Sequence, residues 1–184
     1  MTPRRRILIL FAHPAFEKSV VNRHLLAAAQ RLAGVHVHDL YEIYPDFCVD
    51  VPREQALLAE HDVIVFHHPF YWYSTPALLK EWQDLVLEYG FAYGRQGTAL
   101  HGKWLLTATT TGGERAAYDG VSHPTMSELL APFRRTADLC GMRYLPPFVV
   151  HATDKLHRSP LLDDAATRYA TCCVPCVTAH AWTM

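Results

Sequence analysis

The amino-acid sequence predicts an α/β fold in which a parallel sheet lies between two layers of helices. Short apolar runs alternate with longer segments whose apolar residues recur at helical spacing, which is typical of parallel strands covered on both faces. The chain has 184 residues, which is enough for one domain with a complete core. Half of the residues are apolar and 19% are charged, as in an ordinary globular protein.

Five apolar runs are the predicted strands. They are Ile7–Ala12, Val35–Leu40, Val63–His67, Trp104–Thr109 and Tyr144–His151. Five parallel strands in a chain of this length predict a flavodoxin-like three-layer sandwich with strand order 2-1-3-4-5, rather than a longer dinucleotide-binding sheet. No internal repeat or low-complexity segment interrupts the alternation, so residues 1–184 are expected to form a single domain.

The segments between these runs carry apolar residues at intervals of three and four, which predicts helices. The predicted helices are Val20–Ala33, Arg53–Glu60, Pro76–Tyr89, Met126–Cys140 and a last one from near Leu161 toward Thr178. Ser74 and Thr75 offer N-cap hydroxyls for the third helix, and Pro76 suits its first turn. Pro175 is expected to disturb the last helix.

Charge and hydropathy exclude several functions. The net charge is −1, so nothing in the composition indicates binding to nucleic acid. No apolar run reaches the ~18 residues that a membrane span needs. The run from Ile7 to Ala12 is too short for the core of a secretion signal. A cytoplasmic protein is therefore expected.

The cysteines do not form a recognisable framework. They are Cys48, Cys140, Cys172, Cys173 and Cys176, and an odd number argues against a disulfide scaffold and fits a reducing compartment. Cys173 and Cys176 form a Cys-x-x-Cys motif, but redox motifs of this kind follow a strand, and none is predicted before it. Buried or incidental thiols are the favoured interpretation. No second Cys or His pair of matching spacing accompanies the motif, so no metal is expected.

In a sheet of this order, ligands bind beyond the carboxyl ends of the strands, where the strand order reverses. The loops after the first, third and fourth strands meet there. The first loop, residues 13–22, leads into a helix near Ser19, and the N-terminus of a helix is a natural seat for a phosphate. His13, Ser19 and Asn22 add polar side chains. The alternatives are a plain N-cap for Ser19 and a packed histidine for His13. The loop has neither a Walker A nor a Gly-x-Gly-x-x-Gly pattern, which disfavours a nucleoside triphosphate or a Rossmann-bound NAD.

The other two loops suit a flat ligand. Four aromatic residues follow the third strand, from Phe70 to Tyr73, and because they cannot all point into one core, one or two should line a pocket. The paired Gly112 and Gly113 let the backbone after the fourth strand approach a ligand closely. Tyr118 and His123 are polar groups in the same loop, with plain surface residues as the alternative. A phosphate seat, an aromatic wall and a glycine-rich polar floor together match flavin mononucleotide (FMN).

These motifs resemble those of the flavodoxin-like NAD(P)H quinone reductases, the family of DT-diaphorase. Within that family, the sequence is most similar to the bacterial ancillary flavoproteins of glutathione-regulated potassium efflux systems. The resemblance extends from Ile7 to about Pro147. It rests on Ala12-His13-Pro14 with Ser19 and Asn22, on the segment from Pro69 to Trp82, on Gly97–Lys103 and on Thr110–Gly113.

The resemblance implies a role for each loop. It places His13, Ser19, Val20 and Asn22 around the flavin phosphate and ribityl chain. It places Pro69, Phe70, Tyr71, Trp72 and Tyr73 along the isoalloxazine ring, and Thr110, Thr111, Gly112 and Gly113 at the polar edge of the ring. Tyr118 and His123 match the catalytic Tyr and His that face the flavin, although their spacing is one residue shorter than the family pattern. The chain lacks the long C-terminal extension of the mammalian enzymes, which implies FMN rather than FAD.

The resemblance also implies an activity and partners. The expected reaction is a ping-pong transfer of two electrons from NAD(P)H through the flavin to a quinone. A homodimer is expected, with Trp72, Tyr73 and the helix that carries Trp82 as candidates for its surface. One alternative is a regulatory, ancillary subunit of a potassium–proton antiporter, at the inner face of the cell membrane. Another is an azoreductase or nitroreductase, since reduced flavin is a promiscuous donor.

Overall fold

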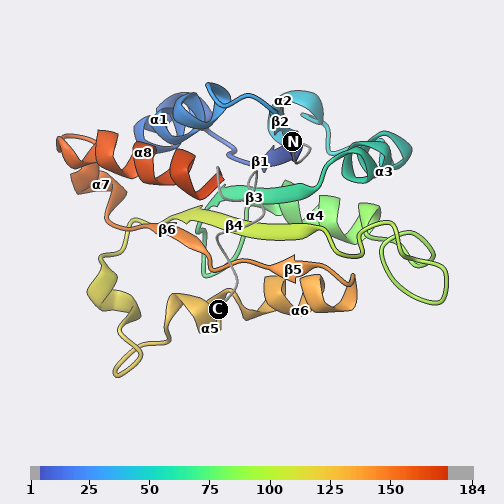
Figure 1. Cartoon of the computed structure of the whole chain (residues 1–184). Helices are drawn as coiled ribbons and strands as arrows, with labels where there is room; N and C mark the ends of the chain where they lie inside the picture. The colour runs from blue at the N-terminus through green and yellow to red at the C-terminus, as the bar shows by residue number, and fades with distance from the viewer. Residues whose placement is uncertain (1–4, 174–184) are drawn as a thin grey trace.

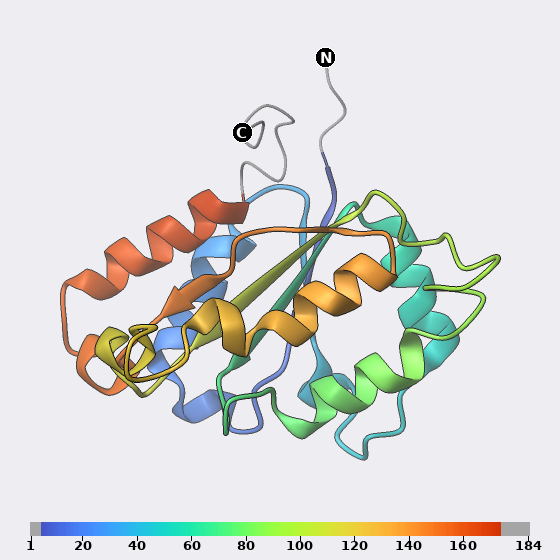
Figure 2. The same ribbon diagram turned by 90° about the horizontal axis from the view of Figure 1, so that it is seen from below.

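The computed structural model describes residues 5–173, which form a parallel sheet with helices on both faces (Figures 1 and 2). The strands are β1 (Ile7–Phe11), β2 (Val35–Asp39), β3 (Val63–Pro69), β4 (Trp104–Thr110), β5 (Arg143–Tyr144) and β6 (Phe148–Val150). Their order is β2-β1-β3-β4-β5, and β6 also pairs with β4. The flavodoxin-like order predicted from the alternation of strands and helices is therefore confirmed, with a sixth strand in addition.

The sixth strand arises because the predicted strand Tyr144–His151 is interrupted. β5 pairs with the start of β4, and β6 pairs with its end. Pro146 and Pro147 lie between the two, and proline has no N–H to donate to the ladder. Three residues, Leu145 to Pro147, stand opposite Leu106 and Thr107, so the edge strand resumes pairing after one extra residue. The single strand predicted here was wrong for that reason.

The helices divide between the two faces of the sheet. α1 (Val20–Gln30) and α8 (Leu161–Cys173) pack on one face, whereas α3 (Val51–Glu60), α4 (Ala77–Val86), α5 (Met126–Leu129) and α6 (Ala131–Leu139) pack on the other (Figure 2). Alternate strand residues feed two separate cores. Ile7 and Ile9 pack toward α1 and α8, and Leu8 and Leu10 pack toward α3 and α4. Each such side chain contributes roughly 1.5–3 kcal/mol by its burial.

Two helix predictions need correction. The helix predicted over Met126–Cys140 is α5 followed by α6, because the chain breaks at Leu130 and Pro132 occupies the first turn of α6. Pro76 itself is the N-cap of α4, without a side-chain cap, so the predicted N-cap role of Ser74 and Thr75 was wrong. Short elements without a helical period were missed. They are α2 (Leu40–Ile43), α7 (Thr153–Leu156) and the 3-10 turns η1 (Phe16–Lys18) and η2 (Arg115–Tyr118).

A buried carboxylate joins the elements on the α3–α4 face. Glu54 is completely buried and accepts hydrogen bonds from His38 Nε2 at 2.8 Å, the Tyr44 hydroxyl at 2.5 Å and Trp82 Nε1 at 2.8 Å. Burial alone raises the pKa of Glu54, but these hydrogen bonds outweigh it, and the pKa lies below its ordinary value. Trp82 is thus an interior residue, so it cannot itself form part of a dimer surface.

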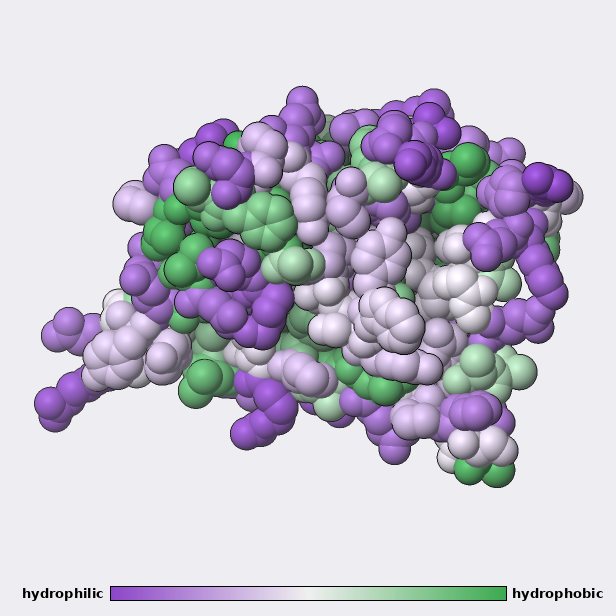
Figure 3. Space-filling model, turned by 180° about the vertical axis from the view of Figure 1, so that it is seen from behind, coloured by the Kyte–Doolittle hydropathy of each residue, from purple (hydrophilic) through white to green (hydrophobic). Residues whose placement is uncertain are grey.

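The surface, the hydropathy of the helices and the cysteines complete the description of the fold. Seen from behind, hydrophilic side chains project around the periphery, and hydrophobic residues gather in small groups between them (Figure 3). No helix within residues 5–173 is long and apolar enough to cross a membrane. Cys48, which is exposed, and Cys140, which is buried, are free thiols. Pro175, Cys176 and the predicted end of the last helix lie outside the described residues.

Two neighbouring histidines are buried on opposite faces of β3. His67 lies on the α1–α8 face beside Phe11, and His68 lies on the α6 face beside Phe133. Burial lowers the pKa of His67 to about 3 and that of His68 to about 4. Both side chains are therefore neutral in the folded protein near pH 7.

This burial predicts a loss of stability in acid. Between about pH 6.5 and pH 4 the unfolded chain binds protons at both histidines that the folded chain does not bind, so the free energy of unfolding falls as the pH falls. One such group contributes a slope of up to about 1.4 kcal/mol per pH unit. In urea unfolding between pH 6.5 and 4.5, His68→Leu should reduce the slope of the unfolding free energy against pH by the contribution of about one histidine. An unchanged slope would contradict the neutral, buried state of His68.

Candidate functional site

A cavity opens at the carboxyl ends of β1, β3 and β4, where the strand order reverses. Its volume is about 540 Å³, which is within the range of small-molecule sites. The lining residues come from the loop after β1 and the start of α1, from the ends of β3 and β4 and the loops that follow them, and from α7 and its C-cap. They are His13, Ala15, Lys18, Ser19, Val20, Val21, Asn22, Pro69, Phe70, Tyr71, Thr110, Gly112, Thr153, Asp154 and His157.

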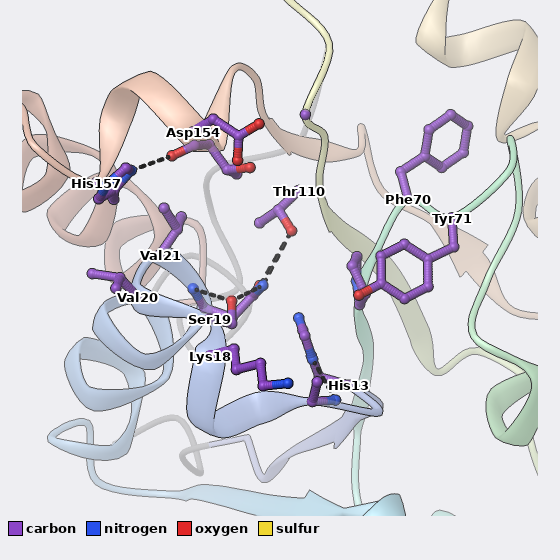
Figure 4. Close-up of a pocket in the computed structure, with 15 residues that line it drawn as sticks. His13, Lys18, Ser19, Val20, Val21, Phe70, Tyr71, Thr110, Asp154 and His157 are labelled. Carbon is purple, nitrogen blue, oxygen red and sulfur yellow. Dashed lines mark hydrogen bonds between the residues drawn. The ribbon is translucent and has the colours of Figure 1, made fainter.

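One end of the cavity is suited to an anion. Ser19 is the N-cap of α1, and the first N–H groups of this 11-residue helix have no intrahelical partner. His13 Nδ1 accepts the Ala15 N–H at 3.1 Å, which leaves Nε2 as the protonated donor of the neutral ring, and burial lowers the pKa of His13. Figure 4 shows Lys18 and His13 on one side of Ser19, and Asp154 and His157 on the other. A single phosphate group suits this arrangement of N–H donors and an ammonium group.

The opposite side of the cavity is aromatic. Phe70 and Tyr71 line it, whereas Trp72 and Tyr73 stand at the tip of a hairpin closed by pairing between Tyr71 and Ser74. The tip residues are 93% and 66% exposed. Both have positive φ angles, of 49° and 63°, as the two central residues of a type I′ turn require. The turn therefore divides the aromatic run into two residues that face the cavity and two that face outward.

The floor of the cavity is glycine-rich. A Cβ atom added to Gly112 would meet no atom within 4 Å, so the backbone at this position is open to a ligand. A Cβ atom at Gly113 would lie 2.9 Å from the Tyr118 hydroxyl, so this glycine is needed for the position of Tyr118. Thr110 lines the cavity, and the Thr111 hydroxyl donates to the Gly113 carbonyl at 2.8 Å behind it.

The two candidate catalytic residues lie apart from the cavity lining and in different settings. The Tyr118 ring lies 6.3 Å from that of Phe70 and packs on His151, with ring centroids 5.3 Å apart. His123 is exposed, in a loop held by the Asp119 carboxylate, which accepts its backbone N–H at 3.1 Å. No ring contact joins His123 to Tyr118 among the described residues. The histidine on the Tyr118 ring is thus His151, which the sequence reasoning did not single out.

α7 is a further wall that the sequence reasoning missed. Thr153 and Asp154 line the cavity from this helix, and His157 lines it from the C-cap. Backbone hydrogen bonds hold its start against the β4 loop, from Thr153 N–H to Thr111 at 3.1 Å and from Ala152 N–H to Gly113 at 3.0 Å. Ala152 is left-handed, with φ of 54°, so the chain turns back over the cavity immediately after β6. The loop after β6 begins at the same edge of the sheet as the loops after β1, β3 and β4. This topology was the signal that could have identified α7 as part of the site.

No group of three or more His, Cys, Asp or Glu side chains in residues 5–173 is placed to hold a metal ion.

The fold and the cavity define a class: a doubly wound parallel α/β domain with one anion seat and one aromatic wall at its switch point. The chain belongs to a family described as having a flavodoxin-like fold, whose profile matches residues 5–172.

Three relatives place the chain within that family. It is 50% identical over 153 residues to the glutathione-regulated potassium-efflux system ancillary protein KefG of Enterobacter sp. (strain 638), covering 82% of this chain and 84% of that protein. General stress protein 14 of Treponema denticola, solved in complex with FMN, is 37% identical with a TM-score of 0.86, over 93% of this chain and 99% of that one. An NADPH-quinone reductase of P. pentosaceus is 34% identical with a TM-score of 0.79, over 97% and 99%.

Proposed function

We propose that this chain is a flavin-dependent NAD(P)H:quinone oxidoreductase that uses FMN. The observation that carries the proposal is the cavity, which combines one anion seat, one aromatic wall and an open glycine backbone at the switch point of the sheet. The names of two relatives support it: one was solved with FMN and the other is an NADPH-quinone reductase.

The cavity residues fit FMN part by part. Ser19, Val20 and Asn22 at the start of α1, with His13 and Lys18, would hold the phosphate and the ribityl chain. Pro69, Phe70 and Tyr71 would flank the ring, and Thr110 and Gly112 would meet its polar edge. Thr111 and Gly113 would support that edge from behind. Trp72 and Tyr73 project from the rim and would border the ring only from outside.

Bound FMN would supply the two-electron hydride chemistry between NAD(P)H and a quinone. The protein's own residues would position the reactants and donate or accept the protons that the reaction needs. Donors at the Gly112 backbone would stabilise negative charge at the polar edge of the ring. A quinone that receives a hydride also needs a proton to become a quinol, so a titratable group beside the ring has a defined task.

The experiment that tests this function uses the protein loaded with FMN. We expect a flavin absorbance spectrum, oxidation of NADH or NADPH, and reduction of a soluble benzoquinone. Gly112→Val should remove FMN uptake and quinone reduction while keeping the parent's melting temperature, since its Cβ atom meets no protein atom and enters the cavity. A parent protein that takes up no FMN, or a Gly112→Val variant that binds it as tightly, would contradict the site.

We further propose an imidazole as the proton carrier beside Tyr118. The family resemblance points to His123, whereas the geometry supports His151, whose ring packs on Tyr118. His151 Nδ1 lies 3.3 Å from the Thr111 hydroxyl, whose own proton goes to Gly113. Nδ1 therefore donates and Nε2 is free to take and pass on a proton. Burial, and then the nearby Arg115, lower the pKa of His151, so this nitrogen is unprotonated at neutral pH.

The two histidines can be compared directly. His151→Ala should lower quinone turnover by roughly 100-fold, the lower end of acid–base effects, with FMN still bound. His123→Ala should change turnover by less than about 3-fold, because His123 lies in an exposed loop. Steady-state kinetics with a flavin absorbance control measures both. The reverse result would return the role to His123.

A second candidate function is that of an ancillary subunit, which one relative's name as an ancillary protein of a potassium-efflux system supports. The exposed Trp72 and Tyr73 favour a partner surface, because both are held in left-handed conformations and present their rings to solvent, although the edge of Tyr73 also contacts Phe70. We propose that this hairpin contacts a second copy of the chain in a homodimer. An antiporter partner would place the protein in the cytoplasm, peripheral at the inner face of the membrane, and co-purification with an antiporter would favour that role.

The double variant Trp72→Asn with Tyr73→Gly tests the hairpin surface. Asn-Gly is the preferred pair for a type I′ turn, so the variant should fold at least as stably as the parent. Light scattering should find a dimer for the parent and a monomer for the variant. A strictly monomeric parent with full quinone reductase activity would reject the proposed dimer.

A further inference from the structure

A continuous chain of hydrogen bonds runs from α8 to the anion seat. It begins at Tyr169, whose completely buried hydroxyl lies 3.0 Å from His67 Nδ1. His67 Nε2 lies 2.9 Å from Asn22 Oδ1. Asn22 Nδ2 donates to Ser19 Oγ at 2.8 Å and to Thr110 Oγ1 at 3.2 Å. Figure 4 shows the Ser19 and Thr110 end of this chain at the cavity.

The positions of the donors and acceptors fix the direction in which this series of hydrogen bonds runs. Asn22 Nδ2 faces Ser19 Oγ, so its Oδ1 faces His67 and can only accept. The Thr110 hydroxyl lies near both atoms of the amide, 3.2 Å from Nδ2 and 3.4 Å from Oδ1, and is compatible with this orientation. His67 Nε2 must then carry the proton. The buried ring is neutral and carries one proton only, so Nδ1 is a bare acceptor and the Tyr169 hydroxyl donates to it.

This direction determines what Ser19 can do. Its oxygen accepts both the Asn22 side-chain N–H and the Asn22 backbone N–H, the latter at 3.4 Å. Both lone pairs of the hydroxyl are therefore engaged, and its proton is left to donate. Ser19 lines the cavity at the start of α1, where an anion would sit.

We propose that Tyr169, acting through His67 and Asn22, orients the Ser19 hydroxyl as a hydrogen-bond donor to the phosphate of the bound flavin. The inference rests on the proposed FMN site and deepens it. Tyr169 and His67 are positioning residues, because neither lines the cavity. They belong to α8 and β3, which are far in sequence from Ser19 at the start of α1.

The opposite direction would disable the seat. Without the Tyr169 hydroxyl, the His67 proton can move to Nδ1, and Nε2 becomes an acceptor. The Asn22 amide would then turn its NH2 group to His67 and its oxygen to Ser19. The Ser19 proton would go to Asn22, and Ser19 would present a lone pair to the phosphate instead of a donor.

The test compares FMN with riboflavin, which lacks the phosphate. Affinities are measured by flavin fluorescence quenching for the parent, Tyr169→Phe, His67→Gln and His67→Leu. Tyr169→Phe and His67→Leu should weaken FMN binding roughly 10-fold, the factor for a lost hydrogen bond to a charged group, and leave riboflavin binding unchanged. His67→Gln should bind FMN like the parent, because an amide can accept from Tyr169 and donate to Asn22.

His68→Leu is the matched control, since His68 is the next residue, is equally buried and faces the other side of the sheet. It should leave both affinities unchanged. If Tyr169→Phe lost FMN and riboflavin binding equally, or lost neither, this inference would be overturned, whereas the proposed function would stand. A parent protein that binds neither flavin would overturn the proposed function with it.

A second measurement does not need flavin. Nitrogen-15 NMR should find His67 of the parent as the Nε2–H tautomer, and Tyr169→Phe should populate the Nδ1–H tautomer. This readout holds even where the affinity of a variant is affected by its stability. An Nδ1–H tautomer in the parent would mean that the hydrogen bonds run in the opposite direction, and it would overturn the inference.

Discussion

The pairing of β1, β3 and β4 at their carboxyl ends is the constraint on which the rest of the structure depends. Phe11 pairs with His67, and Pro69 pairs with Thr110, so three strands end in register at one edge. Backbone hydrogen bonds continue just beyond them, from Ala12 N–H to His67 and from Phe70 N–H to Thr110. Each cavity loop thus leaves the sheet from a position already fixed by its neighbour. The anion seat and the aromatic wall face each other for that reason.

The polar interior beneath the seat is a second consequence of this register. Placing His67 opposite Phe11 on the α1–α8 face puts an imidazole in an otherwise apolar core, where it must find partners. Asn22 and Tyr169 supply them, so two helices are fixed to one strand by hydrogen bonds as well as by packing. A buried network with all its members satisfied is rigid, and rigidity at the base of a phosphate seat reduces the cost of ordering it when a ligand binds.

The sequence was a good guide where one interaction dominates and a poor one where several compete. The alternation of apolar runs and helical periods predicted the strand order, because only a parallel sheet buries both faces of such strands. The loop rule placed Ser19, Tyr71 and Gly112 in a single cavity. The break at Pro146 and Pro147 has a local cause, the missing proline N–H, which competes with the apolar run that predicted one strand. The contact of His151 with Tyr118 depends on tertiary packing, which has no local period. α7 is only four residues long, too short for a periodic pattern.

Tyr71 joins the cavity to the outer surface, and this connects the two proposed functions. It lines the aromatic wall and also closes the strained hairpin through its pairing with Ser74. Trp72 and Tyr73 occupy left-handed conformations that cost of order 1–3 kcal/mol each, and the hairpin must be held in them. A partner that covers the hairpin tip would supply that restraint and fix Tyr71 at the same time. Binding of a partner and ordering of the ring site would then be coupled, and each would strengthen the other to the same extent.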